Sequence, residues 1–172
     1  MTLVFLGIGS NLERDKNIVA AVRALEQEFE TVRLSKVYES EAAGFIGPPF
    51  YNLVASIYTD KGLVDLQQWC KQVEQHHGRA VNAERFCSKT LDIDILLYGN
   101  LCCELTPQSP KLPREEILHQ AYVLKPMAEL APLLKHPETQ KSFRQHWREF
   151  NSLKAPNGLM GSVAVDWTLV PD

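Results

Sequence analysis

Residues 85–100 have the sequence RFCSKTLDIDILLYGN, in which two aspartates stand two positions apart within an apolar run. The apolar run predicts a strand over residues 91–98, and alternate side chains of a strand share one face. Asp92 and Asp94 therefore point the same way, with their Cβ atoms about 6–7 Å apart. Two ionised carboxylates this close repel each other unless a cation lies between them. The opposite, buried face is then expected to hold Ile93, Ile95 and Leu97.

Basic residues stand just upstream of this strand, at Arg79, Arg85 and Lys89. Such side chains bind anionic oxygens. Paired carboxylates, a hard cation and basic groups together predict phosphoryl-transfer chemistry on Mg²⁺. Without that context, an Asp-x-Asp pair on a strand more often forms a solvated face, and the two arginines could equally be surface charges.

The segments before the aspartate strand follow a regular order. Strands are predicted over residues 3–8, 31–39 and 50–59, and amphipathic helices over 15–29 and 62–76. With the aspartate strand, this gives the order β-α-β-β-α-β, which is typical of an α+β, ferredoxin-like fold with an antiparallel sheet and two helices on one face. A doubly wound parallel sheet is less favoured, because no helix separates the second and third strands.

After the aspartate strand the pattern changes to helical segments. Helices are predicted over residues 121–130, with Pro126 inside, and 141–150. GSVAVDWTLV, at 161–170, alternates in the manner of an edge strand. We therefore expect added C-terminal helices and a possible edge strand within a single domain, 1–172.

Composition excludes several classes of protein. The chain is 45% hydrophobic and 23% charged with a net charge of −3, so no overall positive field draws it to nucleic acid. No apolar run approaches the roughly 20 residues that span a bilayer, and the N-terminus lacks the features of a signal peptide. We expect a cytoplasmic protein that binds neither nucleic acid nor membrane, with its four cysteines reduced and mostly structural.

Several further motifs occur in a fixed order around the aspartate strand. They are GSNL at 9–12, FYN at 50–52, GR at 78–79, TLDIDILLYGN at 90–100, LP at 112–113 and AYVLKPMAELAP at 121–132. Together these segments, spread over about residues 3–135, resemble the family of 6-hydroxymethyl-7,8-dihydropterin pyrophosphokinases. The resemblance leaves a C-terminal extension of about residues 136–172.

The resemblance implies a fold, an activity and a metal. Members of this family are ferredoxin-like enzymes of the folate pathway, which transfer pyrophosphate from ATP to the hydroxymethyl group of a reduced pterin and release AMP. By this likeness Asp92 and Asp94 hold two Mg²⁺ ions when ATP is bound. ATP and the reduced pterin would be the partners of a monomer or weak dimer.

Residue by residue, the resemblance also implies the substrate ligands. Arg79 and Lys89 would be catalytic, steadying the phosphates during transfer. The residues expected to bind ATP are Glu74, Arg79, Arg85, Lys89 and Arg114. The residues expected to bind the pterin are Ser40, Phe45, Phe50, Asn52 and Tyr122.

Three positions depart from the family pattern. Cys87 stands where the family has a small residue, Lys89 where it has an arginine, and Arg114 where it usually has a histidine. Lysine keeps the charge of arginine but loses its planar fork. These departures also fit a diverged paralogue that binds a pterin or nucleotide without this activity, or that uses another substrate. A ferredoxin-like interaction module is a third interpretation, although a packing face has no need of two aspartates.

Overall fold

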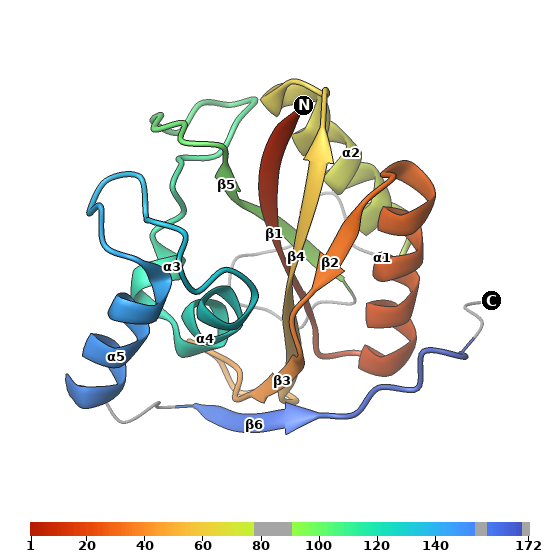
Figure 1. Cartoon of the computed structure of the whole chain (residues 1–172). Coiled ribbons are helices and arrows are strands. Elements are labelled where there is room, and N and C mark those ends of the chain that lie inside the picture. Colours follow the sequence, from red (N-terminus) through yellow and green to blue (C-terminus); the bar gives the residue numbers. More distant parts are fainter. Residues whose placement is uncertain (78–90, 154–157, 170–172) are drawn as a thin grey trace.

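The computed structural model describes residues 1–77, 91–153 and 158–169. It is a mixed α/β fold in which helices lie on both sides of one sheet (Figure 1). The elements in chain order are β1 (Thr2–Ser10), α1 (Arg14–Glu28), β2 (Val32–Leu34), β3 (Val37–Ser40), β4 (Phe50–Thr59), α2 (Leu63–His76), β5 (Asp92–Tyr98), α3 (Glu116–His119), α4 (Ala121–Leu130), α5 (Phe143–Leu153) and β6 (Leu159–Val163).

The sheet is antiparallel at every pairing, with the order β5-β1-β4-β3-β6, and β2 pairs with β4 beside β3. β1 and β4 are its long central strands. β5, which carries the two aspartates, pairs with the far side of β1. The aspartate strand and the Phe50–Asn52 segment are therefore separated by one strand only.

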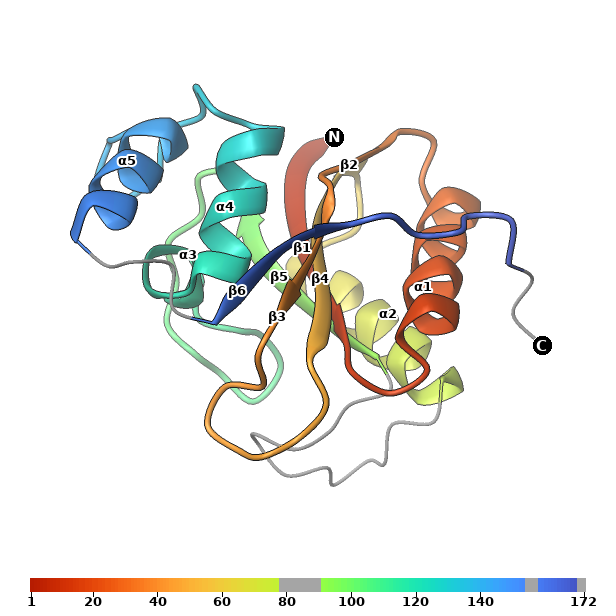
Figure 2. The same ribbon diagram turned by 90° about the horizontal axis from the view of Figure 1, so that it is seen from below.

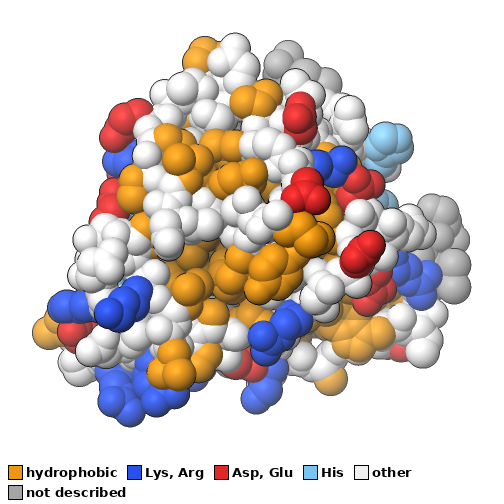
Figure 3. Space-filling view, turned by 45° about the horizontal axis from the view of Figure 1, so that its top comes forward, with side chains coloured by type: hydrophobic (Ala, Val, Ile, Leu, Met, Phe, Trp, Pro, Cys, Tyr) orange, Lys and Arg blue, Asp and Glu red, His pale blue; other side chains and the backbone are white. Residues whose placement is uncertain are grey.

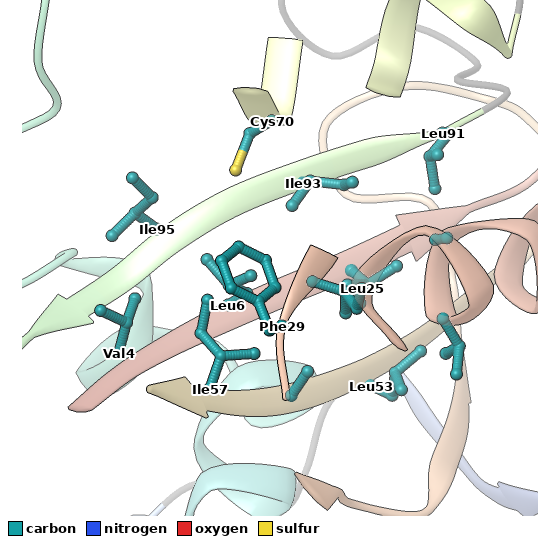
Figure 4. Close-up of a cluster of buried hydrophobic side chains, with 14 of the residues drawn as sticks. Val4, Leu6, Leu25, Phe29, Leu53, Ile57, Cys70, Leu91, Ile93 and Ile95 are labelled. Atoms are coloured by element: carbon teal, nitrogen blue, oxygen red, sulfur yellow. The ribbon is translucent and has the colours of Figure 1, made fainter. Parts of the chain in front are cut away.

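Each face of the sheet carries its own hydrophobic core. On one face, alternate residues of β1, β4 and β5 pack against α1 and α2, as Figure 4 shows for Leu6, Ile57 and Ile93 against Leu25 and Cys70. The other face is covered by α3, α4 and α5, which bury a second cluster. That cluster consists of Phe5, Val54, Leu96, Leu97, Ile117, Val123, Leu124, Met127 and Phe143.

The predicted helices 15–29 and 62–76 correspond to α1 and α2. The single strand predicted over 31–39 is wrong, because it is interrupted between β2 and β3. At the break, Ser35 Oγ accepts a hydrogen bond from Val54 N at 2.9 Å, and Ser35 N donates to Val54 O at 2.9 Å. The side-chain hydroxyl thus takes the place of a backbone acceptor, and the segment bends without leaving β4.

Simple alternation predicts that Leu97 shares the face of Ile93 and Ile95. This prediction is wrong, because Leu97 lies on the opposite face. Leu6 pairs with Ile95 but Phe5 pairs with Leu97, so Leu96 is an extra residue in β5. This β-bulge places both Leu96 and Leu97 in the second core. The alternation on which the aspartate pair depends lies before the bulge and is intact.

The C-terminal part of the described chain joins the same sheet. The predicted helix 121–130 is α4, with Pro126 inside it, and the predicted helix 141–150 corresponds to α5. β6 pairs with β3 at one edge of the sheet, and Figure 2 shows these two strands side by side. The expected strand 161–170 is wrong in its bounds, because β6 ends at Val163, where its partner Val37 begins β3.

No helix in the described segments combines the length and the apolar character required to cross a membrane. Figure 3 shows one face of the molecule, on which hydrophobic side chains lie exposed between acidic and basic ones. Cys70, Cys102 and Cys103 are free thiols. Cys87 lies outside the described residues.

Candidate active site

A cavity of about 710 Å³ opens on the face of the sheet that carries α3 and α4. Its floor is formed by β1, β4 and β5. Its walls come from the loop after β3 and from the segment 105–123. Eight of the predicted site residues line it, namely Ser40, Phe45, Phe50, Asn52, Asp92, Asp94, Arg114 and Tyr122.

Strand register explains why these residues meet. Asn52 on β4 and Asp92 on β5 both pair with Gly9 of β1, so the three residues form one row across the sheet. With strands about 4.8 Å apart, the backbones of Asn52 and Asp92 lie about 10 Å from each other. A Cβ atom added at Gly9 would lie 3.2 Å from Asn52 Oδ1 and 3.7 Å from Phe50 Cδ1. Gly9 therefore leaves room for both side chains to lie over β1.

One end of the cavity is aromatic. Phe45 and Phe50 meet edge to face with ring centroids 6.2 Å apart. Asn52 is buried, and its Nδ2 donates to Ser40 Oγ at 2.7 Å. This bond fixes the Asn52 amide, which keeps an N–H and a carbonyl oxygen for further hydrogen bonds. Two flat rings beside a fixed amide suit a flat heterocycle with an amide edge.

The base of the loop before Phe50 is held by Arg14, at the start of α1. Arg14 Nη1 lies 2.9 Å from Glu39 Oε1 and donates to Pro49 O at 3.0 Å. Its guanidinium carbon also lies 4.0 Å from the centroid of the Tyr51 ring. Three contacts to one planar group fix the direction in which the chain enters β4.

The other end of the cavity is charged. Asp92 and Asp94 are both partly exposed there, and Arg114 Nη2 lies 3.1 Å from Asp94 Oδ1 and 3.4 Å from Glu116 Oε1. Burial, and then the charges of Glu116, Asp94 and Asp92, raise the pKa of the Tyr122 hydroxyl to about 12. The acidic groups therefore act on Tyr122 of α4.

The donor set at this end fits a hard divalent cation. Two carboxylates on one face of a strand, open to a cavity, offer the oxygen ligands that Mg²⁺ takes. Within the described segments, no group of three or more His, Cys, Asp or Glu side chains is arranged to hold a metal ion. A magnesium ion here would complete its coordination with oxygens of a bound ligand or water, as Mg²⁺ commonly does.

Glu74 does not line the cavity. It lies on α2, across the sheet, where it is 5% exposed and its Oε1 accepts a hydrogen bond from Ile93 N at 2.7 Å. Ile93 stands between the two aspartates. Glu74 thus binds the strand that presents them, and its assignment to ATP stays a prediction.

Three of the predicted site residues, Arg79, Arg85 and Lys89, lie outside the described residues. Gly9, Glu116 and Lys111 line the cavity but were not among the predicted site residues. Gly9 lies in the floor of the cavity because of the register in which β1 pairs with β4 and β5, and a single sequence does not specify that pairing. Glu116 could have been found by its place two residues after Arg114.

Solved structures share this architecture at low sequence identity. A crystal structure of Plasmodium falciparum HPPK-DHPS with pteroate superposes with a TM-score of 0.67 at 13% identity, over 88% of this chain and 42% of that one. A structure of HPPK-DHPS in complex with substrates gives 0.69 at 11% identity, over 91% and 45%. This chain spans less than half the length of those chains. The likeness places it among mixed α/β proteins of that fold.

The family follows from the sequence comparisons. The family model described as 7,8-dihydro-6-hydroxymethylpterin-pyrophosphokinase (HPPK) matches residues 5–132. Proteins named 2-amino-4-hydroxy-6-hydroxymethyldihydropteridine pyrophosphokinase are 38% identical in Pseudomonas aeruginosa, over 78% of this chain and 84% of the relative, and 34% identical in Aquifex aeolicus, over 90% and 95%. The chain belongs to the 7,8-dihydro-6-hydroxymethylpterin-pyrophosphokinase family, as its motifs predicted.

Proposed function

We propose that this protein is a pyrophosphokinase that transfers the β,γ-diphosphate of ATP to the hydroxymethyl group of 6-hydroxymethyl-7,8-dihydropterin and releases AMP. Family membership over residues 5–132 supports the reaction. The single observation that carries the assignment to this site is the row formed by Asn52, Gly9 and Asp92. In support of this proposal, the backbone of Asn52, the candidate ligand of the heterocycle, lies about 10 Å from that of Asp92 on the floor of the same cavity.

The aromatic end of the cavity is the proposed pterin site. Phe45, Phe50 and Tyr122 supply flat surfaces, and Asn52, held by Ser40, reads the amide edge of the ring. Ring contacts of this kind contribute about 0.5–1.5 kcal/mol each beyond the burial of area. In this proposal the hydroxymethyl group of the pterin points toward β5, which carries the two carboxylates.

The charged end is the proposed phosphate and metal site. Asp92 and Asp94 would hold Mg²⁺, two ions with ATP bound, which would lower the pKa of the pterin hydroxyl and neutralise developing charge. Arg114, together with Arg79, Arg85 and Lys89, is proposed to bind the phosphates. The transfer needs no covalent intermediate on the protein, so these residues act by positioning and charge. Glu74 would act on ATP only indirectly, through β5.

The second candidate is a diverged relative that binds the same ligands without transfer. The observation that favours it is the contact between Arg114 and Asp94, because the residue that departs from the family pattern pairs with one of the two proposed metal ligands. The two candidates share one pterin site and differ in whether AMP forms.

Incubation of the purified protein with ATP, Mg²⁺ and the reduced hydroxymethylpterin separates the two. The proposed function predicts stoichiometric formation of AMP and pterin diphosphate, which chromatography measures. Pterin binding by fluorescence without AMP would establish the diverged relative instead. Neither binding nor AMP would contradict both and favour an interaction module.

The remaining expectations accompany this proposal. We propose that residues 1–172 form one domain whose strand order is that of a ferredoxin-like sheet with β6 added at its edge. We also propose a cytoplasmic protein that is a monomer or weak dimer. The pairing of β6 with β3 supports the single domain, because the C-terminal extension then completes the same sheet.

A further inference from the structure

Arg114 occupies a fixed place beside the aspartate strand. Its backbone N donates to Leu96 O at 3.0 Å, which ties residue 114 to β5. From there its side chain, 25% exposed, reaches Asp94. The guanidinium therefore lies where a metal cation would have to approach the Asp94 carboxylate.

The contact itself is a weak form of arginine–carboxylate pairing. One nitrogen, Nη2, serves both Asp94 at 3.1 Å and Glu116 at 3.4 Å, so neither carboxylate receives the two parallel hydrogen bonds of a bidentate pair. Arg114 Nε is buried and has no hydrogen-bond partner among the described residues. A buried donor without a partner is costly, so an arrangement that offers Arg114 more acceptors would be favoured.

The charges around Arg114 explain why a cation is needed there. Asp92, Asp94 and Glu116 all line the cavity beside it, and three carboxylates at one end repel one another. Lys111, the other basic residue of the described lining, is paired with Glu115 at 2.7 Å. Arg114, in contrast, pairs with Asp94 at 3.1 Å.

We propose that Arg114 is the resident counter-ion of Asp94 and competes with the divalent metal ion until a nucleotide arrives. This inference rests on the proposed function, and it adds how the binding of the metal ion depends on the binding of the nucleotide. The phosphate oxygens of a nucleoside triphosphate would accept hydrogen bonds from Arg114, including one from Nε. The metal ion that accompanies the nucleotide would then bind Asp94 in place of Arg114. Arg114 thus lowers the affinity for metal alone and raises the affinity for metal with nucleotide.

The two effects have opposite signs, and a merely structural arginine would not produce them. Arg114→Ala should bind Mn²⁺ more tightly than the wild type in the absence of nucleotide. The gain should be about two- to fivefold, the size expected for a partly exposed ion pair. The same variant should bind Mn²⁺-ATP more weakly. Electron paramagnetic resonance of free Mn²⁺ measures the first affinity, and equilibrium dialysis of labelled ATP the second.

Two control variants assign the effect to this pair. Lys111→Ala removes a positive charge from the same cavity, but the partner of Lys111 is Glu115. The logarithm of its gain in Mn²⁺ affinity should therefore be less than half of that measured for Arg114→Ala. Asp94→Ala in the Arg114→Ala background should abolish the gain. Arg114→Gln, which keeps length and polarity without charge, replaces Arg114→Ala if the latter does not fold.

Unchanged or weaker Mn²⁺ binding by the folded Arg114 variant would overturn the inference, as would an equal gain in Lys111→Ala. These measurements use no turnover. An absence of AMP from the wild type would therefore count against the proposed function alone, and a failure of the Mn²⁺ experiment would count against the role of Arg114 alone.

Discussion

Asn52 and Asp92 stand in one row of the sheet, yet their surroundings differ in charge. Asn52 is buried beside Ser40 and Phe50, whereas Asp92 lies at the end that holds Asp94 and Glu116. A buried amide is specific for a hydrogen-bonding edge, and a partly exposed carboxylate pair is specific for a cation. The two ends of one cavity can therefore bind two parts of a reaction, a ring and a metal-bound phosphate.

Tyr122 carries a pH dependence that follows from this arrangement. Its pKa in the folded protein is raised to about 12, so the folded state keeps a proton that the unfolded chain loses near pH 10. The resulting stability is present below pH 10 and is lost as the pH rises toward 12. Tyr122→Phe should therefore show a shallower fall of the free energy of unfolding between pH 10 and 12, measured by urea denaturation. The exposed Tyr58 provides the control variant, Tyr58→Phe, which should follow the wild type; a Tyr122→Phe curve parallel to that of the wild type would refute the argument.

At the scale of the elements, β1 contributes to the cavity because it has no side chain at position 9. Its Gly9 lies between Asn52 of β4 and Asp92 of β5, and a methyl group there would press on Asn52 Oδ1 at 3.2 Å. Gly9→Ala should weaken binding of the pterin by about three- to tenfold, while the free energy of unfolding changes by about 1 kcal/mol or less. Fluorescence titration of the pterin tests this.

Gly62→Ala, at the start of α2 on the other side of the sheet, is the matched control. Its added Cβ would meet Asp65 Oδ2 at 3.7 Å, an ordinary contact. The control should bind the pterin as the wild type does. Equal pterin affinity in both variants would show that Gly9 does not shape the site.

The elements also show how far the sequence predicts the fold. Period-two alternation holds along the predicted strand 50–59: Phe50 and Asn52 line the cavity, whereas Leu53 and Ile57 belong to the core on the other face of β4. It failed at Leu97, because a bulge inserts one residue and reverses the alternation after it. Nothing local in the sequence LDIDILLY marks that bulge, since apolar residues occupy both faces at that end of the strand.

The candidate site shows the same limit. Asp92 and Asp94 were found because two carboxylates are unusual within an apolar strand, whereas the aromatic residues were found only through the family resemblance. Gly9 and the position of Glu74 were not, because their roles depend on which strands pair and which helix lies behind them. The contact of Arg114 with Asp94 joins residues 20 apart in the sequence. The family resemblance predicted only that Arg114 would bind ATP.

At the scale of the whole molecule, the C-terminal extension is continuous with the rest. Phe143, at the start of α5, is fully buried in the core that also contains Phe5 of β1 and Leu96 of β5. Residues 136–172 lie outside the segment matched by the family model, yet part of them fills one face of the sheet.

Phe143→Ala should therefore lower the free energy of unfolding by about 3–5 kcal/mol, the usual cost of removing a buried ring. Urea denaturation followed by circular dichroism should show one transition at a lower midpoint. Leu153→Ala, at the exposed end of the same helix, should stay within about 0.5 kcal/mol of the wild type. A small separate transition in Phe143→Ala, with the main one unmoved, would show that the extension folds independently.

The central claim concerns the whole cavity: that the carboxylates of β5 hold a divalent metal on behalf of a nucleotide. Mg²⁺-dependent ATP binding by Asp94→Ala, measured by calorimetry with and without Mg²⁺, tests it most directly. Asp65→Asn, an exposed carboxylate on α2, is the control, and the thermal unfolding of both variants shows that they are folded. We predict that Asp94→Ala loses the Mg²⁺-dependent part of ATP binding while Asp65→Asn keeps it. A folded Asp94→Ala that binds Mg²⁺-ATP as tightly as the wild type would contradict the account.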